Sequence, residues 1–191
     1  MIYYLMGKSA SGKDTLYRRL RELRPDWQEV VLYTTRPMRT GEIEGKTYHF
    51  ISAERMAELA AAGRLIEART YQTVCGPWIY ATVDDGQIRE PESRDYLMIG
   101  TLESYVKVRQ YYGAALLRPL YIEVPDEVRL ARAREREARE AQPRFDEMER
   151  RFQADARDFS PEKLAAAGIR RHYLNMDMEK CIDEIIQDTG K

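Results

Sequence analysis

The amino-acid sequence predicts an α/β fold in which helices flank a parallel β-sheet. Short apolar stretches rich in β-branched and aromatic residues alternate with helical segments, as expected for strands joined by helical crossovers. The first stretch, residues 2–6, runs directly into a loop of small residues and then into a helix. The length of 191 residues fits one domain, with room for an inserted lobe. In such a fold, ligands bind at the carboxyl ends of the strands.

The other elements follow in order along the chain. A helix over residues 12–23 should end before Pro25, because the residue preceding a proline is disfavoured in helical geometry. Ser52 is placed to cap a helix over residues 52–62, which Gly63 ends. Further strands are expected at residues 29–35, 65–71, 78–82, 95–99, 116–124 and 169–174, and further helices after residue 86, from 126 past 136, from 145, and near the end, where Ile182, Ile185 and Ile186 share one face.

The loop after the first strand has the spacing G-x-x-x-x-G-K. Its glycines let backbone N–H groups turn inward around a phosphate, the next helix adds the partial positive charge of its N-terminus, and Lys13 adds a full charge. Its position between strand and helix is the context that this motif requires. The sequence therefore predicts a site for a di- or triphosphate, formed by Gly7, Lys8, Ser9, Ala10, Ser11, Gly12, Lys13, Asp14 and Thr15. The alternative is a glycine-rich turn with a capping serine or aspartate.

Asp14 stands where a serine or threonine usually follows the lysine of this motif and holds magnesium. A carboxylate is a harder and more strongly charged magnesium ligand than a hydroxyl, and Thr15 keeps a hydroxyl next to it. Asp14 is therefore the predicted metal ligand.

The composition restricts the possible classes of function. A formal net charge of −1 gives no support for nucleic-acid binding, and no apolar run is long enough to predict a membrane-spanning helix. Residues 1–6 lack the basic region and the length of a secretion signal, so we expect a soluble, cytoplasmic protein. Cys75 and Cys181 are expected to be free thiols, and with only His49 and His172 the sequence has no histidine-based metal cluster.

Two arginines, Arg36 and Arg39, lie three residues apart across Pro37. The proline stiffens the segment, and two guanidinium forks at this spacing suit the binding of one phosphate or carboxylate. The alternative is an exposed loop with solvated arginines.

The phosphate loop is followed by T-T-R-x-x-R-x-G-E-x-x-G-x-x-Y-x-F, and together these motifs resemble the guanylate kinases, in order over nearly the whole chain. The resemblance implies a P-loop nucleotide-kinase fold in a single domain. Its core would comprise residues 1–33, 84–131 and 152–191, its mixed α/β acceptor lobe residues 34–83, and its helical lid residues 132–151. It also implies that ATP and GMP are converted to ADP and GDP with Mg²⁺, by a monomer or a homodimer.

The resemblance assigns the acceptor site residue by residue. It implies that Arg36, Arg39, Tyr48 and Tyr80 hold the phosphate of GMP, and that Glu67 and Thr82 face the base. Guanine offers N1–H and an exocyclic amine, and a carboxylate accepts from both, a pairing that adenine cannot reproduce. Without the resemblance, Glu67 would read as a surface residue of a strand.

One departure from the family pattern leaves the acceptor open. Guanylate kinases usually have Asp-x-Asp after the strand at residues 95–99, whereas this chain has Ile99 and Thr101, and Glu103 is the nearest carboxylate. A kinase of the same fold with another phosphorylated acceptor, such as a deoxynucleotide or a sugar phosphate, is therefore an alternative. A non-catalytic protein-binding module is a second one, but the intact Gly7, Gly12 and Lys13 favour the enzyme.

The resemblance also implies a catalytic lid. Arg132 and Arg136 are four residues apart on one helical face, and Arg151 lies on the next helix. In the family such arginines close on the transferred phosphoryl group, while Lys13 follows it, so Lys13, Arg36, Arg132, Arg136 and Arg151 are the predicted catalytic residues. On pattern alone these arginines would form a solvated face. The resemblance implies that Asn175 lies beside the adenine of ATP. The bland interpretation is that Asn175 caps the last helix, and the two roles are compatible.

Overall fold

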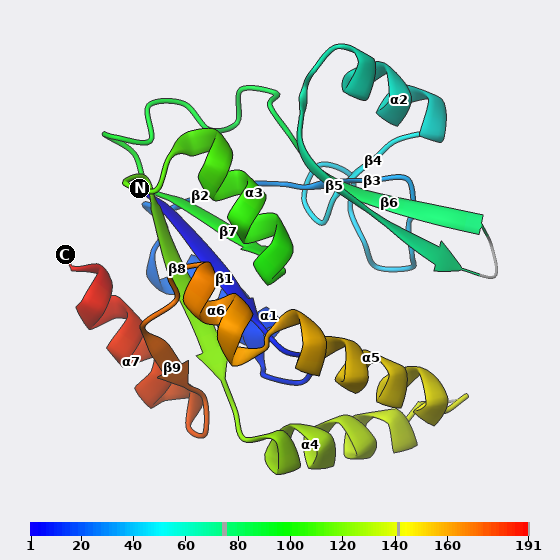
Figure 1. The fold of residues 1–191 in the computed structure, drawn as a ribbon, viewed down its shortest axis with the longest axis vertical. Coiled ribbons are helices and arrows are strands. Elements are labelled where there is room, and N and C mark those ends of the chain that lie inside the picture. The colour runs from blue at the N-terminus through cyan, green and yellow to red at the C-terminus, as the bar shows by residue number, and fades with distance from the viewer. Residues whose placement is uncertain (74–75, 141, 191) are drawn as a thin grey trace.

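The computed structural model describes residues 1–73, 76–140 and 142–190. Its larger sheet has five parallel strands in the order β2-β7-β1-β8-β9 (Figure 1). These strands are β1 (Ile2–Gly7), β2 (Gln28–Glu29), β7 (Tyr96–Gly100), β8 (Leu117–Glu123) and β9 (His172–Leu174). β1 pairs with both β7 and β8, so it lies inside the sheet, and all of its residues are buried.

Helices cover both faces of this sheet, which confirms the predicted α/β fold. Alternate residues of β1 enter two separate apolar clusters, because successive side chains of a strand point to opposite faces. Tyr4 and Met6 pack under α3 and α6, while Tyr3 and Leu5 pack under α1 and α7. The four covering helices are α1 (Lys13–Leu23), α3 (Leu102–Tyr112), α6 (Pro161–Ala166) and α7 (Met178–Thr189).

A second sheet, in the order β4-β3-β6-β5, forms the inserted lobe. β5 and β6 pair antiparallel, and β3 joins them by pairing with β6. Met56 packs with Ala81 and Val83 in an apolar cluster of the lobe itself. The Ser52 hydroxyl accepts a hydrogen bond from the Arg55 N–H and caps α2, as predicted. The elements are β3 (Tyr33–Thr34), β4 (His49–Phe50), α2 (Ala53–Ala61), β5 (Leu65–Thr73) and β6 (Gly76–Val83).

Two of the predicted elements were wrong. The strand expected at residues 29–35 is divided into β2 of the larger sheet and β3 of the lobe, since the chain passes from one sheet to the other between them. The helix expected after residue 86 is absent from residues 84–95, all of which are described. In this segment the Gln87 side chain accepts a hydrogen bond from the Val31 N–H and donates to the Val31 carbonyl. It also donates to the Asp85 carboxylate.

Two short-range signals for helices were missed. Thr101 and Ser104 form a capping box at the start of α3. Ser160 caps α6, with Pro161 at its first position. The Ser-Pro start of α6 was readable in the sequence, whereas the box at α3 has serine in place of the usual glutamate or glutamine at its third helical position. The last strand is shorter than expected, because residues 169–171 precede β9 and Ile169 packs into the apolar cluster under α6 instead.

Helices α4 (Asp126–Ala138) and α5 (Phe145–Asp158) contact each other and project from the larger sheet on the same side of the view as the lobe (Figure 1). The lid predicted at residues 132–151 begins inside α4 and ends inside α5. The limits of core, lobe and lid therefore stay a prediction. Among the helices of residues 1–73, 76–140 and 142–190, none has the length and apolar character needed to cross a bilayer.

Candidate active site

The phosphate loop lies between β1 and α1, as its motif predicted. Gly12 has a φ of +82° at the start of α1, a conformation that strains residues with a Cβ atom. A Cβ on Gly12 would lie 2.5 Å from Asn175 Nδ2, and one on Gly7 would lie 2.7 Å from the Ile122 carbonyl oxygen. Both positions therefore need glycine, for backbone conformation at Gly12 and for close approach at both.

Asn175 fixes the far end of this loop. Its buried side-chain amide donates to the Ser11 backbone carbonyl at 2.8 Å, and the backbone carbonyl of Asn175 accepts from Arg132 at 3.2 and 3.3 Å. The alternative that Asn175 caps the last helix was wrong, because Asp177 is the cap of α7 and accepts from the Glu179 and Lys180 N–H groups. Asn175 and Arg132 are thus brought to the phosphate loop, although they lie far from it in sequence.

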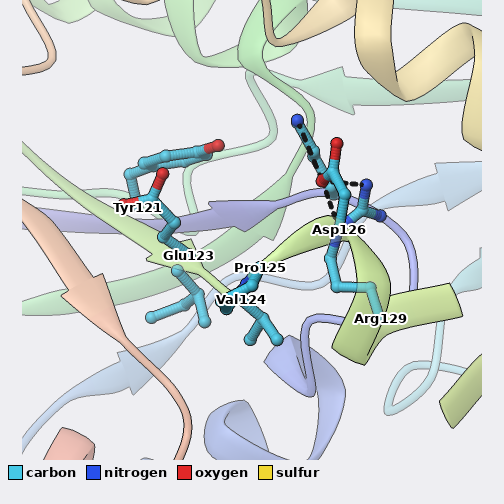
Figure 2. Close-up of a pocket in the computed structure, with 8 residues that line it drawn as sticks. Tyr121, Glu123, Val124, Pro125, Asp126 and Arg129 are labelled. Atoms are coloured by element: carbon cyan, nitrogen blue, oxygen red, sulfur yellow. Dashed lines mark hydrogen bonds and ion pairs between the residues drawn. The ribbon is translucent and has the colours of Figure 1, made fainter. Parts of the chain in front are cut away.

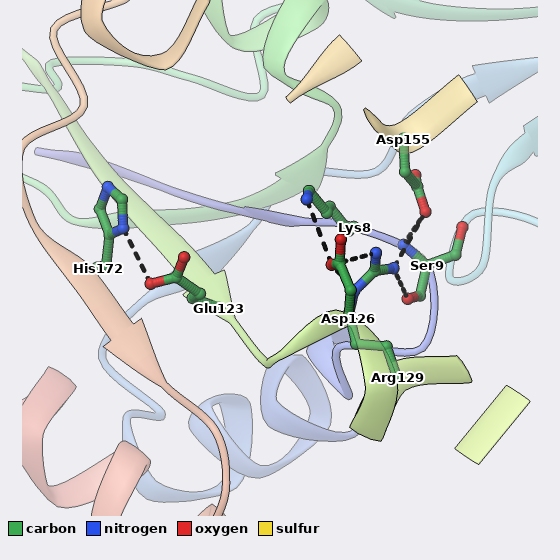
Figure 3. A network of polar contacts seen from close by, with 7 residues as sticks. All are labelled: Lys8, Ser9, Glu123, Asp126, Arg129, Asp155 and His172. Atoms are coloured by element: carbon green, nitrogen blue, oxygen red, sulfur yellow. Dashed lines mark hydrogen bonds and ion pairs between the residues drawn. The ribbon is translucent and has the colours of Figure 1, made fainter. Parts of the chain in front are cut away.

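A network of charged groups borders the loop, and its central residue, Arg129, was not predicted from the sequence (Figure 3). The Arg129 side chain is 2% exposed and donates to Asp126 at 2.7 Å, to the Ser9 carbonyl at 2.7 Å and to Asp155 at 3.3 Å. The Asp155 carboxylate in turn accepts from the Ser9 N–H at 2.8 Å. An anionic oxygen therefore already sits on one N–H of the phosphate loop.

The same network forms one wall of a cavity of about 250 Å³ at the carboxyl end of β8 (Figure 2). Lys8 contributes the loop side and lies 3.4 Å from Asp126. Hydrogen bonding from Arg129 lowers the pKa of Asp126 below its usual range, so that carboxylate is ionised. The lining residues are Lys8, Tyr121, Ile122, Glu123, Val124, Pro125, Asp126 and Arg129. The cavity lies at the strand edge where the fold predicts ligands.

Lys13 and Asp14 occupy the first turn of α1. The Lys13 ammonium lies 3.9 Å from the Asp14 carboxylate, and the Asp14 side chain is 82% exposed. Thr15 is exposed next to it. Both charged groups are therefore accessible at the loop, in the positions the motif predicts.

The predicted acceptor site lies in the lobe, and Arg36 is one of its three buried members, with Glu67 and Thr82. The Arg36 guanidinium donates to Glu42 at 2.7 and 3.0 Å, to the Pro37 carbonyl at 2.7 Å and to the Tyr80 hydroxyl at 3.0 Å. The guanidinium also lies 5.7 Å from the Tyr48 ring, and burial raises the pKa of Tyr48. The structure thus brings Arg36, Tyr48 and Tyr80 together.

Arg39 does not join this group. Its side chain is exposed and makes no hydrogen bond within the described residues, while its backbone N–H donates to Glu42 at 2.7 Å. Glu42 was not singled out from the sequence, although its place in the G-E pair six residues after Arg36 could have indicated it. The hydrogen bonds from Arg36 lower the pKa of Glu42.

Glu67 is not a surface residue, so that alternative was wrong. Its side chain is 0% exposed and accepts from the Thr82 hydroxyl at 2.9 Å and from Arg69 Nε at 3.1 Å. Arg69 reaches across to the Thr101 hydroxyl at 3.2 Å and so links the lobe to the start of α3. Glu67 and Thr82, which the resemblance assigned to the acceptor base, lie together, and Arg69 is an addition that the sequence did not suggest.

The three lid arginines lie on α4 and α5 but do not converge. Arg132 is half-buried against Asn175, whereas Arg136 and Arg151 are exposed, the latter 3.9 Å from Glu147. Exposed ion pairs such as Arg150–Glu147 on α5 contribute only a few tenths of a kcal/mol each. In this arrangement Arg136 and Arg151 are available to a ligand.

The remaining predictions concern thiols and metals. Cys181 is a free, buried thiol whose pKa burial raises to about 12, while Cys75 lies outside the described residues. Within the described part of the chain, no group of three or more histidine, cysteine, aspartate or glutamate residues could hold a metal ion.

The sequence model of the guanylate kinase family matches residues 2–159. The guanylate kinase of Nitratidesulfovibrio vulgaris is 30% identical to this chain over 197 residues, covering 97% of this chain and 84% of that protein. Those of Rhodopseudomonas palustris and Frankia casuarinae are 40% and 44% identical over segments that cover 35% and 33% of this chain. These two segments span only 30% and 34% of the relatives' own lengths.

The fold has a counterpart among solved structures. The crystal structure of guanylate kinase from Anaplasma phagocytophilum aligns with a TM-score of 0.67 at 22% identity, covering 97% of this chain and 81% of that chain. That likeness shows a shared fold. Because the family match extends over most of the sequence, the chain belongs to the guanylate kinase family.

Proposed function

We propose that this protein transfers the γ-phosphoryl group of ATP to GMP, giving ADP and GDP. The observation that carries the proposal is a phosphate loop with its glycine geometry intact, in the same chain as an acceptor face built from Arg36, Tyr48, Tyr80 and Glu67. The family membership supports it.

In the proposed reaction, an oxygen of the GMP phosphate attacks the γ-phosphorus of ATP. A new O–P bond forms as the bond from the γ-phosphorus to the β–γ bridging oxygen breaks, and that oxygen leaves with ADP. The attacking phosphate is already ionised near neutral pH, so no general base is required. The protein's part is to hold the two phosphates in line and to neutralise the charge on the transferred group.

Lys13 and the loop N–H groups would bind the ATP phosphates, with Lys13 following the group in transfer. Arg132 lies next to the loop through Asn175, and Arg136 and Arg151 would close on the same group from the exposed faces of α4 and α5. Because these cations meet the phosphoryl group only when the helices close, they would act mainly on the barrier to transfer.

The residues present also fit a magnesium ion. Mg²⁺ usually keeps several waters and binds one or two carboxylates together with substrate phosphates, and the exposed Asp14 beside Lys13 offers one such carboxylate. Thr15 offers a neighbouring hydroxyl. When bound, the ion would neutralise charge on the phosphate oxygens.

The proposal is tested by ADP release over a panel of acceptors: GMP, AMP, deoxynucleoside monophosphates and sugar phosphates. GMP is expected to give the highest kcat/KM. Turnover of another member of the panel without turnover of GMP would contradict the proposed acceptor. Calorimetry with ATP and magnesium tests the enzyme against a binding module, because a module would bind no nucleotide.

A further inference from the structure

The face of the lobe that carries the acceptor residues contains one cation with no role so far. In the pairing of β5 with β6, Glu67 is opposite Thr82 and Arg69 is opposite Tyr80. Residues directly opposite each other in a strand pair have their side chains on the same face. Arg69 therefore lies on the same face as the Glu67–Thr82 pair, at the next position of that face, opposite the Tyr80 whose hydroxyl accepts from Arg36.

The contacts of Arg69 hold it firmly in this position. Its Nε donates to Glu67 at 3.1 Å, and its Nη1 donates to the Thr101 hydroxyl at 3.2 Å. Its side chain keeps 12% exposure, whereas that of Glu67 keeps 0%. Arg69 is thus the member of this ion pair that reaches solvent.

The ion pair still has hydrogen-bonding capacity. A guanidinium has five N–H donors, of which the two bonds above use two, and each carboxylate oxygen accepts more than one hydrogen bond. Glu67 and Arg69 are anchored by Thr82 and Thr101 respectively, so they present an acceptor and a donor side by side. This is a fixed pattern rather than two independent side chains.

Guanine carries the complementary pattern on adjacent atoms, with N1–H as donor and the 6-keto oxygen as acceptor. Adenine carries the reverse, because its N1 is an acceptor and its 6-amino group is a donor. Adenine would therefore set a lone pair against a carboxylate and an amine against a guanidinium, and both contacts would leave polar groups unpaired.

We infer that Arg69 is a specificity-determining residue, which donates a hydrogen bond to the 6-keto oxygen of the acceptor base while Glu67 accepts from its N1–H. This inference rests on the proposed function, since it concerns the base of the same acceptor. It assigns to one additional residue the choice of a 6-keto purine over a 6-amino purine.

The test measures kcat and KM for GMP, IMP and AMP with the wild-type enzyme and the Arg69→Met variant. IMP keeps the N1–H and the keto oxygen and lacks only the 2-amine. The variant is expected to lower kcat/KM for GMP and IMP alike, by about tenfold or more, mainly through KM, and to leave AMP no worse. The ratio of GMP to AMP would fall accordingly. A uniform loss on all three acceptors would overturn the inference, because that is the result of a purely structural role.

Two further variants keep the test decisive. If Arg69→Met does not fold, Arg69→Lys retains the positive charge beside Glu67 without the planar fork, and it should still lower the GMP to AMP ratio. A wild-type ratio in Arg69→Lys would then overturn the inference. Arg55→Met is the matched control, since Arg55 lies in the same lobe in an exposed pair with Glu58, and its ratio should not change. Wild-type enzyme that does not phosphorylate GMP would instead contradict the proposed function itself.

Discussion

The phosphate loop and the acceptor face hold charge in two different ways. The loop relies on backbone groups and on glycine conformation. Among the described residues, its predicted cation, Lys13, lies near one carboxylate, that of the exposed Asp14, at 3.9 Å. The acceptor face relies on side chains that pair with one another before any ligand arrives, as Arg36 does with Glu42 and Arg69 with Glu67.

This difference follows from what each region is expected to bind. A polyphosphate carries several charges, and backbone N–H groups can surround it without paying the cost of burying many cations. A base with a single phosphate must be recognised by pattern, so its side chains have to be fixed in place by partners. Removing a charge should therefore affect the reaction most at the loop, whereas on the acceptor face it should affect binding and stability together.

The largest effect is expected for Lys13→Met. Lys13 is the full positive charge closest to the transferred group in the proposed reaction, so turnover should fall by about a hundredfold or more. Within the part of the chain that the structure describes, Asp14 is the one carboxylate that pairs with the Lys13 ammonium, so the melting temperature should hardly move. Steady-state kinetics and thermal melting check both parts, and near wild-type turnover in this variant would remove Lys13 from the proposed mechanism.

The next comparison is between Arg136→Ala and Arg36→Ala. Arg136 is exposed, so its loss should lower turnover by about tenfold or more, leave the acceptor dissociation constant nearly unchanged and cost under about 1 kcal/mol of stability. Arg36 is buried among Glu42, Pro37 and Tyr80, so its loss should weaken acceptor binding and also destabilise the protein.

Turnover, acceptor affinity and melting temperature measured for both variants decide this comparison. Wild-type turnover in Arg136→Ala would contradict a catalytic role for Arg136 and favour the alternative, in which the lid arginines form a solvated helical face. An Arg36→Ala variant with unchanged acceptor affinity would show that Glu42 is the permanent partner of Arg36 and that no substrate phosphate replaces it.

The same contrast explains what the sequence could predict. The strand, loop and helix of the predicted phosphate site are contiguous in sequence, so the spacing of the motif predicted their order. The position of Ser52 likewise predicted where α2 begins. The family resemblance implied that Glu67 and Thr82 face the acceptor base; the two side chains share a hydrogen bond, and their role toward a base stays a prediction.

The partners of buried charges could not be predicted, because they come from distant parts of the chain. Arg129 meets the loop across 120 residues and Arg69 meets Thr101 across 32. A charge run such as that of α4 contains exposed and buried arginines alike, and periodicity does not say which one turns inward. Burial at one position depends on the packing of α4 against α5 and the loop, which no local pattern records.

A smaller effect is expected at the contact between α5 and the phosphate loop. Asp155 accepts from the Ser9 N–H, so an ATP phosphate approaching that N–H meets a carboxylate. Asp155→Asn keeps the size and an accepting oxygen but removes the negative charge, so the dissociation constant of ATP should fall by about threefold to tenfold. Asp158→Asn is the control, because Asp158 lies on the same helix, paired with Lys163 and exposed. Calorimetry with ATP checks both variants, and equal affinities in wild type and Asp155→Asn would contradict a role for the Ser9 N–H in phosphate binding.

The smallest effect concerns acid stability on the acceptor face. The pKa of Glu42 is lowered chiefly by its hydrogen bonds from Arg36, so its folded value lies below the value of about 4.3 expected for an unfolded glutamate. A lowered folded pKa contributes stability that is present above the unfolded value and is lost as the pH falls through the folded one. The melting temperature of the wild type should therefore decline below about pH 4.3, and that of Glu42→Gln should decline less steeply over the same range.

Glu103→Gln is the matched comparison, since Lys107 also lowers the pKa of Glu103, but the pair is exposed on α3. Solvent screens the exposed Glu103–Lys107 pair, so Glu103→Gln should flatten the curve of melting temperature against pH less than Glu42→Gln does. The opposite order would contradict the inference that the Arg36–Glu42 pair stabilises the acceptor face at neutral pH.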